Sequence, residues 1–347
     1  MKALHFHEHG DPSKLCYGDL PQPNAGPGSV LVKVRACALN HLDLWVLRGW
    51  PGIKLQLPHI GGADIAGEIA ALGAGVQGWK IGARVALIPG FLPSGYVDEF
   101  TKQGDDCLSP AYQIFGEHTC GGFAEFVEAS ATTLISVPTE LTFQHAAAPL
   151  LVATTAWRML KHRANLKAGE TVLIVGAGGG LNSFSIWLAK DLGATVIALT
   201  STAEKMARAA EFGADEVINY RDCPEWSIEV RRLTGRRGAD LVVDNVGVAT
   251  FQQSLLCLRR GGRLVTVGNT SGPNLRFDNR LVFGKQLSIL GSTMGSEKDA
   301  REAVAYAWTK PLGKLIDQEL PLSEGRRAYE ILEAGNKFGK IVLLNNL

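Results

Sequence analysis

The sequence predicts an α/β protein in which a doubly wound parallel sheet is joined to a second, β-rich domain. Between residues 170 and 290, short apolar strands alternate with helical segments, as the crossovers of a parallel sheet require. Before residue 150, short β-branched strands instead follow one another with Gly and Pro turns between them. A chain of 347 residues is long enough for two domains with separate cores.

The β-rich part contains few helical signals. Its strands are expected at residues 29–36, 68–73, 83–88 and 121–128. The polar stretch 89–119 has little periodicity and is expected to form a long loop. At 143–160 the apolar residues recur at helical spacing, so one helix is expected to lead into the second domain.

The second part reads as six strands with intervening helices. Strands are expected at 171–175, 196–200, 217–220, 240–244, 263–267 and 286–290, and helices at 181–192, 203–212, 226–233 and 251–258. Two further helices (300–308 and 325–334) and a strand (340–344) follow. About 50 residues are marginal as a separate domain, so this segment is expected to pack back on the first one.

A glycine-rich turn, Gly176–Gly180, joins the first of these strands to its helix. Glycines allow a backbone to approach a pyrophosphate closely, and the helix start offers free N–H groups and a positive dipole end. The turn therefore predicts a dinucleotide ligand. The expected contacts are Gly178, Gly179, Gly180, Leu181 and Asn182. Asn182 stands where a last glycine is usual; its side chain either points at a phosphate or merely tolerates the turn.

Composition limits the partners. A net charge of +1 provides no electrostatic footprint for nucleic acid or an anionic membrane, so a small-molecule substrate is expected. No apolar run approaches the ~20 residues of a spanning helix, and the N-terminus has no apolar signal region. Six scattered cysteines without a CxxC pair are typical of free thiols in a cytoplasmic protein.

Several motifs together indicate a family. They are Asn40-His-Leu-Asp, Gly62-Ala-Asp-Ile-Ala-Gly, Gly121-Gly-Phe-Ala-Glu, Thr155-Ala-Trp and Val242-Val-Asp-Asn-Val-Gly. With them the chain resembles the medium-chain dehydrogenase/reductase superfamily over essentially its full length. It is most similar to the zinc-independent, quinone-oxidoreductase-like members and to the zinc-type alcohol dehydrogenases.

The resemblance implies a GroES-like catalytic domain at 1–152 and 294–347, and a Rossmann dinucleotide-binding domain at 153–293. It places the active site in the cleft between the two. It also implies a homodimer formed through the last Rossmann strand, residues 286–290.

Zinc-dependent relatives place metal ligands at positions that are Asn40, Ala63 and Leu151 here. Alanine and leucine have no donor side chain, and an amide is a poor substitute for a thiolate. In the long loop, the four cysteine positions of the structural zinc site are Pro93, Tyr96, Glu99 and Cys107. No zinc is therefore expected, and the loop is expected to be held by packing or to be mobile.

Candidates for the chemistry follow from the same resemblance: Asn40, His41, Trp45 and Asp64, with Asp43 beside them. Asp43 and Asp64 either act in the reaction or organise turns. Asn40 is interpreted as a donor to a substrate oxygen or as a structural turn residue. His41 stands where relatives contact the pyrophosphate, and a proton-donor role is the alternative. Trp45 replaces a tyrosine of the quinone reductases.

The cofactor predicted is NADPH, with NADH less favoured. NAD enzymes place a carboxylate at the end of the second strand, where Thr200 and Ser201 stand here. Lys205 and Tyr220 match positions that hold the 2′-phosphate in NADPH-dependent relatives. The remaining contacts implied by the resemblance are Thr155, Asn245, Gly268, Asn269, Ser292 and Thr293.

Three functions follow. The first is zinc-independent, NADPH-dependent hydride transfer to a quinone, an enone or an activated carbonyl, because nothing would stabilise the alkoxide of an unactivated alcohol. The second is a zinc-type alcohol dehydrogenase acting on alcohols or aldehydes. The third is an NADPH-binding protein without turnover.

Overall fold

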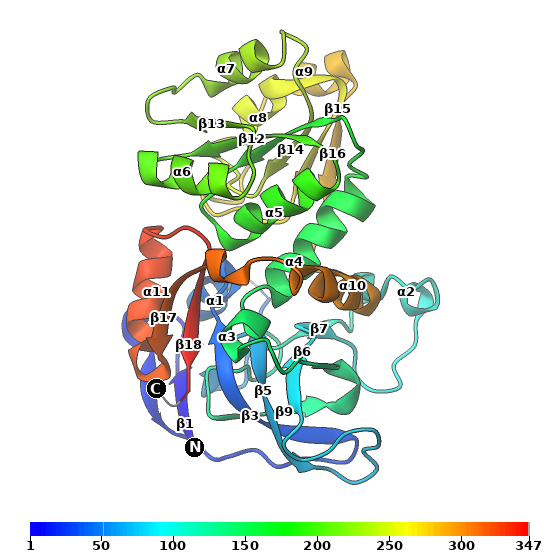
Figure 1. The fold of residues 1–347 in the computed structure, drawn as a ribbon, viewed down its shortest axis with the longest axis vertical. Coiled ribbons are helices and arrows are strands. Elements are labelled where there is room, and N and C mark those ends of the chain that lie inside the picture. Colours follow the sequence, from blue (N-terminus) through cyan, green and yellow to red (C-terminus); the bar gives the residue numbers. More distant parts are fainter. Residues whose placement is uncertain (51, 346–347) are drawn as a thin grey trace. The chain divides into compact units, whose positions relative to one another are not determined.

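The computed structural model describes residues 1–50 and 52–345. The chain divides into two compact units, which we call unit 1 and unit 2 (Figure 1). Unit 1 consists of Met1–Thr154 and the segment from Gly295 onward, and unit 2 of Thr155–Met294. The expected divisions, after residues 152 and 293, differ from these by two residues and one residue.

Unit 1 is built on a seven-stranded sheet. In the order β10-β6-β5-β3-β18-β17, with β9 also paired to β3, its strands form a largely antiparallel layer. Their bounds are β3 (Ser29–Ala38), β5 (Asp64–Leu72), β6 (Arg84–Leu87), β9 (Phe126–Ser130), β10 (Leu134–Ser136), β17 (Ile316–Pro321) and β18 (Lys340–Leu344). Because β18 pairs with β3, the terminal segment returns to the first unit.

Smaller elements complete unit 1. Two further sheets consist of β1 (Lys2–Phe6), β2 (Cys16–Asp19) and β4 (His59–Ile60), and of β7 (Gly90–Phe91) and β8 (Gln113–Ile114). The helices are α1 (His41–Arg48), α2 (Glu99–Lys102), α3 (Phe143–Ala147), α10 (Glu297–Ala307) and α11 (Gly325–Ala334), and α4 (Leu150–Trp157) runs across the division between the units. Short 3-10 turns occupy Pro12–Lys14, Asp106–Leu108, Ala131–Thr133, Leu312–Lys314 and Leu322–Glu324.

The single helix expected at 143–160 is wrong. Proline has no N–H to donate and its ring clashes with the carbonyl four residues back, so Pro149 separates α3 from α4. A π-helical stretch, Arg158–Arg163, then follows α4.

The strand expected at 121–128 begins only at Phe126. Gly121 N donates to Ile60 O and Gly122 N to Gly62 O, both at 2.8 Å, so these glycines pack on the 60–62 backbone. A Cβ at position 121 would lie 2.2 Å from Gly62 O, which only glycine avoids.

The stretch 89–119 is not a plain loop, because it contains α2, β7 and β8. Phe91 and Phe115 pack with ring centroids 4.5 Å apart, and Cys107 is buried. Tyr112 Oη donates to Gly295 O at 2.8 Å. The structure thus describes a stretch held by packing and hydrogen bonds.

Unit 2 is the predicted doubly wound sheet. All six strands are parallel, in the order β13-β12-β11-β14-β15-β16. Their bounds are β11 (Thr171–Val175), β12 (Thr195–Thr200), β13 (Glu216–Asn219), β14 (Ala239–Asp244), β15 (Leu258–Thr266) and β16 (Ser288–Gly291). Continuous apolar runs such as Val172–Val175 are buried, as expected of strands covered on both faces.

Five helices cover this sheet. They are α5 (Gly180–Asp191), α6 (Ala203–Glu211), α7 (Trp226–Leu233), α8 (Phe251–Cys257) and α9 (Asn279–Lys285). In Figure 1, α5 and α6 lie on one side of the strands and α7, α8 and α9 on the other. None of the helices in the described part of the chain is both long and apolar enough to cross a membrane.

Candidate functional site

One edge of the unit 2 sheet gathers most of the predicted cofactor residues. In a parallel sheet all strands end on the same edge, where doubly wound proteins bind their ligands. The predicted residues stand at or just beyond strand ends: Thr200 as the last residue of β12 and Ser201 after it, Tyr220 after β13, Asn245 after β14, Gly268 and Asn269 after β15, and Ser292 and Thr293 after β16.

The glycine turn opens onto the same edge. Gly176 follows β11 with a φ of +78°, a conformation that favours glycine. Gly179 is the N-cap of α5 and supplies no side-chain hydrogen bond. The first N–H groups of α5 therefore receive no acceptor from the cap, as suits a helix start that meets a phosphate. Gly178 lies in this turn, and Gly180 and Leu181 are the first two residues of α5.

Asn182 has a structural task that the sequence left open. Its Nδ2 donates to Val175 O at 2.7 Å and to Gly176 O at 3.2 Å. Its Oδ1 accepts from Asn245 Nδ2 at 2.9 Å, and Asn245 Oδ1 accepts from Val267 N at 2.8 Å. The two amides thus tie the ends of β11, β14 and β15 together. Their side chains hold the shape of the edge.

The end of β12 lacks a carboxylate. Thr200 and Ser201 are buried there, and Thr202 Oγ1 accepts from Lys205 N at 3.3 Å to begin α6. Tyr220 N donates to Thr200 O at 3.0 Å, which brings the half-exposed tyrosine beside the same strand end. No acidic side chain among these would repel a 2′-phosphate.

Two hydroxyls belong to residues at or near the two ends of unit 2 in the sequence. Thr155 Oγ1 donates weakly to Met294 Sδ at 3.9 Å. Ser292 Oγ is buried and has no partner among the described residues. A buried hydroxyl without a partner is costly, so a ligand group that pairs with Ser292 would be favoured.

Unit 1 contains a buried polar cluster formed by Asn40, Asp64 and Lys340, which we call the Asn40 cluster. Lys340 Nζ donates to Asp64 Oδ2 at 2.8 Å and to Asn40 Oδ1 at 2.5 Å. Asn40 Nδ2 donates to Asp64 Oδ2 at 2.9 Å, and Leu151 N to Asp64 Oδ1 at 2.7 Å. Burial raises the pKa of Asp64, and the Lys340 ammonium opposes that shift. The side chains of Asn40, Asp64 and Lys340 are almost completely buried.

Asp43 organises the start of α1. Its Oδ2 accepts from Asn40 N at 2.7 Å and its Oδ1 from Gly62 N at 3.0 Å. Burial raises the pKa of Asp43 to about 7, against the effect of those two N–H donors. Asp43 therefore joins the segments that contain Asn40 and Asp64. This contact agrees with the expectation that Asp43 organises a turn.

His41 is the first residue of α1 and packs edge-to-face on Trp45, with ring centroids 5.0 Å apart. Its Nε2 is buried and has no partner among the described residues. Burial, helped by Arg48 and Lys337, lowers the pKa of His41 to about 4. The imidazole is thus neutral at pH 7, which favours a hydrogen-bonding role over that of a proton-donating imidazolium.

The positions of the zinc ligands do come together. Asn40 and Leu151 both bond Asp64, and Ala63 precedes it in the chain. The donor set does not suit Zn²⁺: no thiolate or imidazole stands at any of the three positions, and Asp64 already accepts from three N–H donors, one of them cationic. Within residues 1–50 and 52–345, no group of three or more His, Cys, Asp and Glu side chains could hold a metal.

Two residues of interest were missed from the sequence. Lys340 is one, because an ion pair between positions 276 residues apart leaves no local signal. Glu117 is the other; it follows Gly116, whose backbone packs against the Gly61–Gly62 segment. Its Oε1 lies 3.8 Å from His118 Nε2, and burial raises its pKa to about 7.

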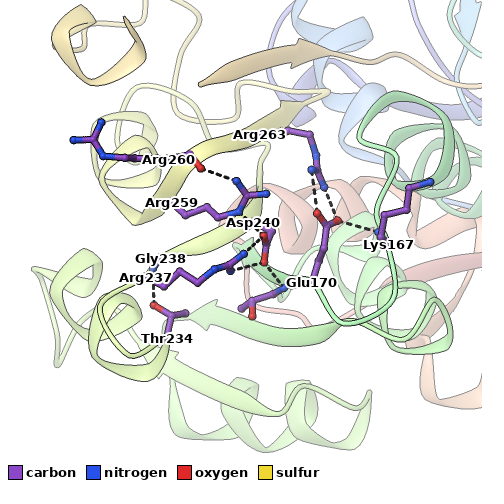
Figure 2. A network of polar contacts seen from close by, with 10 residues as sticks. Lys167, Glu170, Thr234, Arg237, Gly238, Asp240, Arg259, Arg260 and Arg263 are labelled. Atoms are coloured by element: carbon purple, nitrogen blue, oxygen red, sulfur yellow. Dashed lines mark hydrogen bonds and ion pairs between the residues drawn. The ribbon is translucent and has the colours of Figure 1, made fainter. Parts of the chain in front are cut away.

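A second charged network lies at the opposite edge of the unit 2 sheet (Figure 2). Asp240, near the start of β14, accepts from Arg237, from Arg259 and from Thr171 N. Beside it, Glu170 pairs with Arg263. These residues tie the amino ends of three strands together, away from the edge where parallel sheets bind ligands. We call this the Asp240 network.

Family models match both units. The model described as "Alcohol dehydrogenase GroES-like domain" matches residues 26–139, and the one described as "Zinc-binding dehydrogenase" matches residues 180–309.

Individual relatives match almost the whole chain. The acryloyl-coenzyme A reductase of Metallosphaera sedula is 31% identical, covering 94% of this chain and 95% of its own length. The human quinone oxidoreductase is 29% identical, covering 99% and 98%. A crystal structure described as an NAD-dependent alcohol dehydrogenase is 40% identical, with a TM-score of 0.93 and 99% of each chain covered.

Proposed function

Because the chain belongs to the medium-chain dehydrogenase/reductase superfamily, we propose that it transfers hydride from NADPH to an activated acceptor without zinc. The chain is an NAD(P)-dependent oxidoreductase of this superfamily. The acceptor class comprises quinones, α,β-unsaturated carbonyl compounds and activated carbonyls. The observation that supports this choice most is the Asn40 cluster: of the three zinc-ligand positions only Asn40 has a polar side chain, and its amide is already bonded to Asp64 and Lys340.

A bound nicotinamide supplies the hydride, so the protein needs only to bind, orient and polarise. The residues that would hold the dinucleotide are those at the carboxyl edge of the unit 2 sheet. The uncapped start of α5 suits the pyrophosphate, and the unpartnered Ser292 hydroxyl suits a polar group of the cofactor.

Asn40 is the residue we assign to the acceptor. Hydride addition to an enone or quinone places negative charge on an oxygen, and a fixed N–H donor stabilises that charge. Asn40 Nδ2 has two hydrogens, of which one is directed to Asp64 at 2.9 Å. His41 contributes a neutral imidazole whose buried Nε2 needs a partner, and Trp45 supports that ring.

An NADPH-oxidation screen tests this function. The purified protein is mixed with NADPH and, separately, with quinones, enones, an α,β-unsaturated thioester and aldehydes, and absorbance is followed at the reduced-nicotinamide band. We expect turnover with conjugated acceptors and little with simple aldehydes. Binding of NADPH without turnover on any acceptor would support a non-catalytic NADPH-binding protein instead.

The choice of NADPH over NADH rests on Thr200, Ser201, Lys205 and Tyr220. The similar structure described as NAD-dependent favours the other cofactor. Fluorescence titration of both cofactors against the wild type and Lys205→Ala decides between them. We expect NADPH to bind the wild type more tightly and to lose more affinity than NADH on substitution; tighter binding of NADH to the wild type would end the assignment.

A zinc-type alcohol dehydrogenase is the second candidate. It is supported by a relative described as a zinc-type alcohol dehydrogenase-like protein and by the similar structure described as an NAD-dependent alcohol dehydrogenase. Elemental analysis of the purified protein separates the two. We expect far less than one zinc per chain and no gain of alcohol oxidation on adding Zn²⁺; about one zinc per chain would favour the alcohol dehydrogenase.

We also propose a homodimer formed through β16. This strand ends the unit 2 sheet, and Ile289 on it and Phe283 in α9 expose 40% and 67% of their surfaces. An exposed apolar sheet edge is a ready template for pairing with a second copy. Light scattering of the wild type should give twice the chain mass, and Ile289→Lys should give a monomer.

A cytoplasmic location is also part of the proposed function.

A further inference from the structure

We propose that Lys340 is a positioning residue: its buried ammonium fixes the side-chain amide of Asn40 so that an N–H, and not the carbonyl oxygen, is available to substrate. This inference rests on the proposed function of Asn40 as a donor to the acceptor oxygen. Lys340 would thus act on the reaction through Asn40, which its ammonium contacts.

The orientation of the amide follows from the chemistry of its two neighbours. An ammonium can only donate hydrogen bonds and an ionised carboxylate can only accept them. Lys340 Nζ therefore requires the oxygen of Asn40, and Asp64 Oδ2 requires its nitrogen. A flipped amide would place its NH₂ group on the ammonium and its oxygen on the carboxylate, so two attractive contacts would become repulsive.

One N–H of Asn40 is only weakly engaged. The Nδ2 atom donates to Asp64 at 2.9 Å, and its other contact, with Ala38 O, is 3.5 Å long. That second contact is at the limit of hydrogen-bond length, so an acceptor oxygen of a substrate would replace it at little cost. The ammonium on Oδ1 also polarises the amide, which makes its N–H groups better donors.

The cluster is an expensive way to fill a core. Lys340 and Asp64 expose 2% and 0% of their side chains, and burying two charges costs more than packing apolar residues of similar volume. Stability alone therefore does not explain the ion pair. Buried polar groups can instead specify one arrangement of their neighbours, and the neighbour here is Asn40.

A double-mutant cycle tests this role without leaving a lone buried charge. Lys340→Met/Asp64→Asn replaces the ion pair by neutral groups, so these neighbours no longer fix the orientation of the Asn40 side-chain amide. With Asn40 present we expect at least a tenfold loss of kcat, with the affinity for NADPH unchanged. In an Asn40→Leu background the same pair of changes should alter kcat less than twofold, because there is no amide left to orient.

The control is Lys190→Met/Asp215→Asn, which removes a lysine–aspartate pair of 2.7 Å from the surface of unit 2 and should leave kcat unchanged. An equal fold-loss of kcat in the Asn40 and Asn40→Leu backgrounds would show that the ion pair is merely structural and would overturn the inference. So would unchanged kcat in the pair variant.

A second readout needs neither cofactor nor turnover. In protein labelled with ¹⁵N-asparagine, the side-chain NH₂ signals of Asn40 are identified by their loss in Asn40→Leu. We expect two separate, slowly exchanging protons in the wild type and loss of that protection in Lys340→Met/Asp64→Asn. Equal protection in both would overturn the inference, even if the wild type proved inactive on every acceptor and the proposed function failed.

Discussion

Asp64 in unit 1 and Asp240 in unit 2 are both nearly inaccessible carboxylates, yet their cations differ. Asp64 has a single ammonium that is itself 2% exposed. Asp240 has two arginines whose side chains remain 56% and 26% exposed. Burial alone would raise the pKa of Asp240, but hydrogen bonds from Arg237 and Arg259 lower it. An arginine can keep most of its hydration while it reaches a buried acceptor.

The two regions use ion pairs between a carboxylate and a basic side chain in different ways. At the amino edge of the sheet, the ion pairs of Asp240 join strand ends, and their arginine side chains remain partly exposed to water. In the Asn40 cluster, charge is removed from water altogether, at a cost that a purely structural contact would avoid. Only the second arrangement adjoins residues with a proposed chemical role.

The largest expected difference between the two regions is in stability. Lys340→Met leaves Asp64 charged and buried, so the free energy of unfolding should fall by roughly 3–5 kcal/mol. It is measured by urea denaturation, with Lys340→Met/Asp64→Asn as the variant that restores part of the loss. A fall below about 1 kcal/mol would mean that Asp64 tolerates burial without its cation.

Next in size is the effect of Asn40→Leu on catalysis. Loss of one donor to a developing oxyanion costs about 10²–10³ in kcat, so a fall of roughly that size is expected with a conjugated acceptor. Binding of NADPH, measured by fluorescence, should not change. Equal losses in kcat and in cofactor affinity would place Asn40 at the cofactor instead.

Glu117 extends the comparison to a carboxylate that, among the described residues, forms no ion pair with a lysine or an arginine. Its folded pKa of about 7 lies above the ordinary 4.5, so the folded protein binds the extra proton. The resulting stabilisation is full below about pH 4.5 and is lost as pH rises through 7. Glu117→Gln should therefore be more stable than the wild type above pH 7, by roughly 1–3 kcal/mol, and the gain should vanish near pH 4.

Denaturation curves at pH 4, 6 and 8 measure this difference. Glu125→Gln, on a carboxylate that accepts from Lys2 N in an exposed contact, provides the comparison. A pH-independent difference between Glu117→Gln and the wild type would contradict the raised pKa.

The smallest effect is expected at the Asp240 network. Arg237 is mostly exposed, and Asp240 keeps Arg259 and Thr171 N when it is removed. Arg237→Met should therefore cost about 0–1 kcal/mol, and less at high salt. A cost similar to that of Lys340→Met would remove the distinction drawn between the two regions.

The sequence predicted unit 2 better than unit 1 for a physical reason. A parallel sheet alternates apolar strands and helices locally, so helix α7 and strand β11 were predicted to the residue. The other strands of unit 2 were predicted to within two residues, except that β15 begins five residues before the expected start. In unit 1, the pairings of Gly121 and Gly122 with residues 60–62 depend on tertiary contact, and the expected strand there started too early. Pro149 was a local signal that the helical periodicity obscured.

The candidate site shows the same division. Asn40 and Asp64 were identified through their motifs, and the glycine turn through its context. The hydrogen bond between Asn182 and Asn245, and the cation at Lys340, were not predictable, because both depend on groups distant in sequence. Lys340 and Asn40 are 300 positions apart.

That separation has a consequence for biosynthesis. Lys340 lies at the start of β18, which inserts between β3 and β17. A ribosome completes Asn40 and Asp64 long before it reaches this lysine, so the emerging chain must keep an uncompensated carboxylate in contact with water until β18 is released. The Asn40 cluster can therefore assemble only after translation has passed position 340.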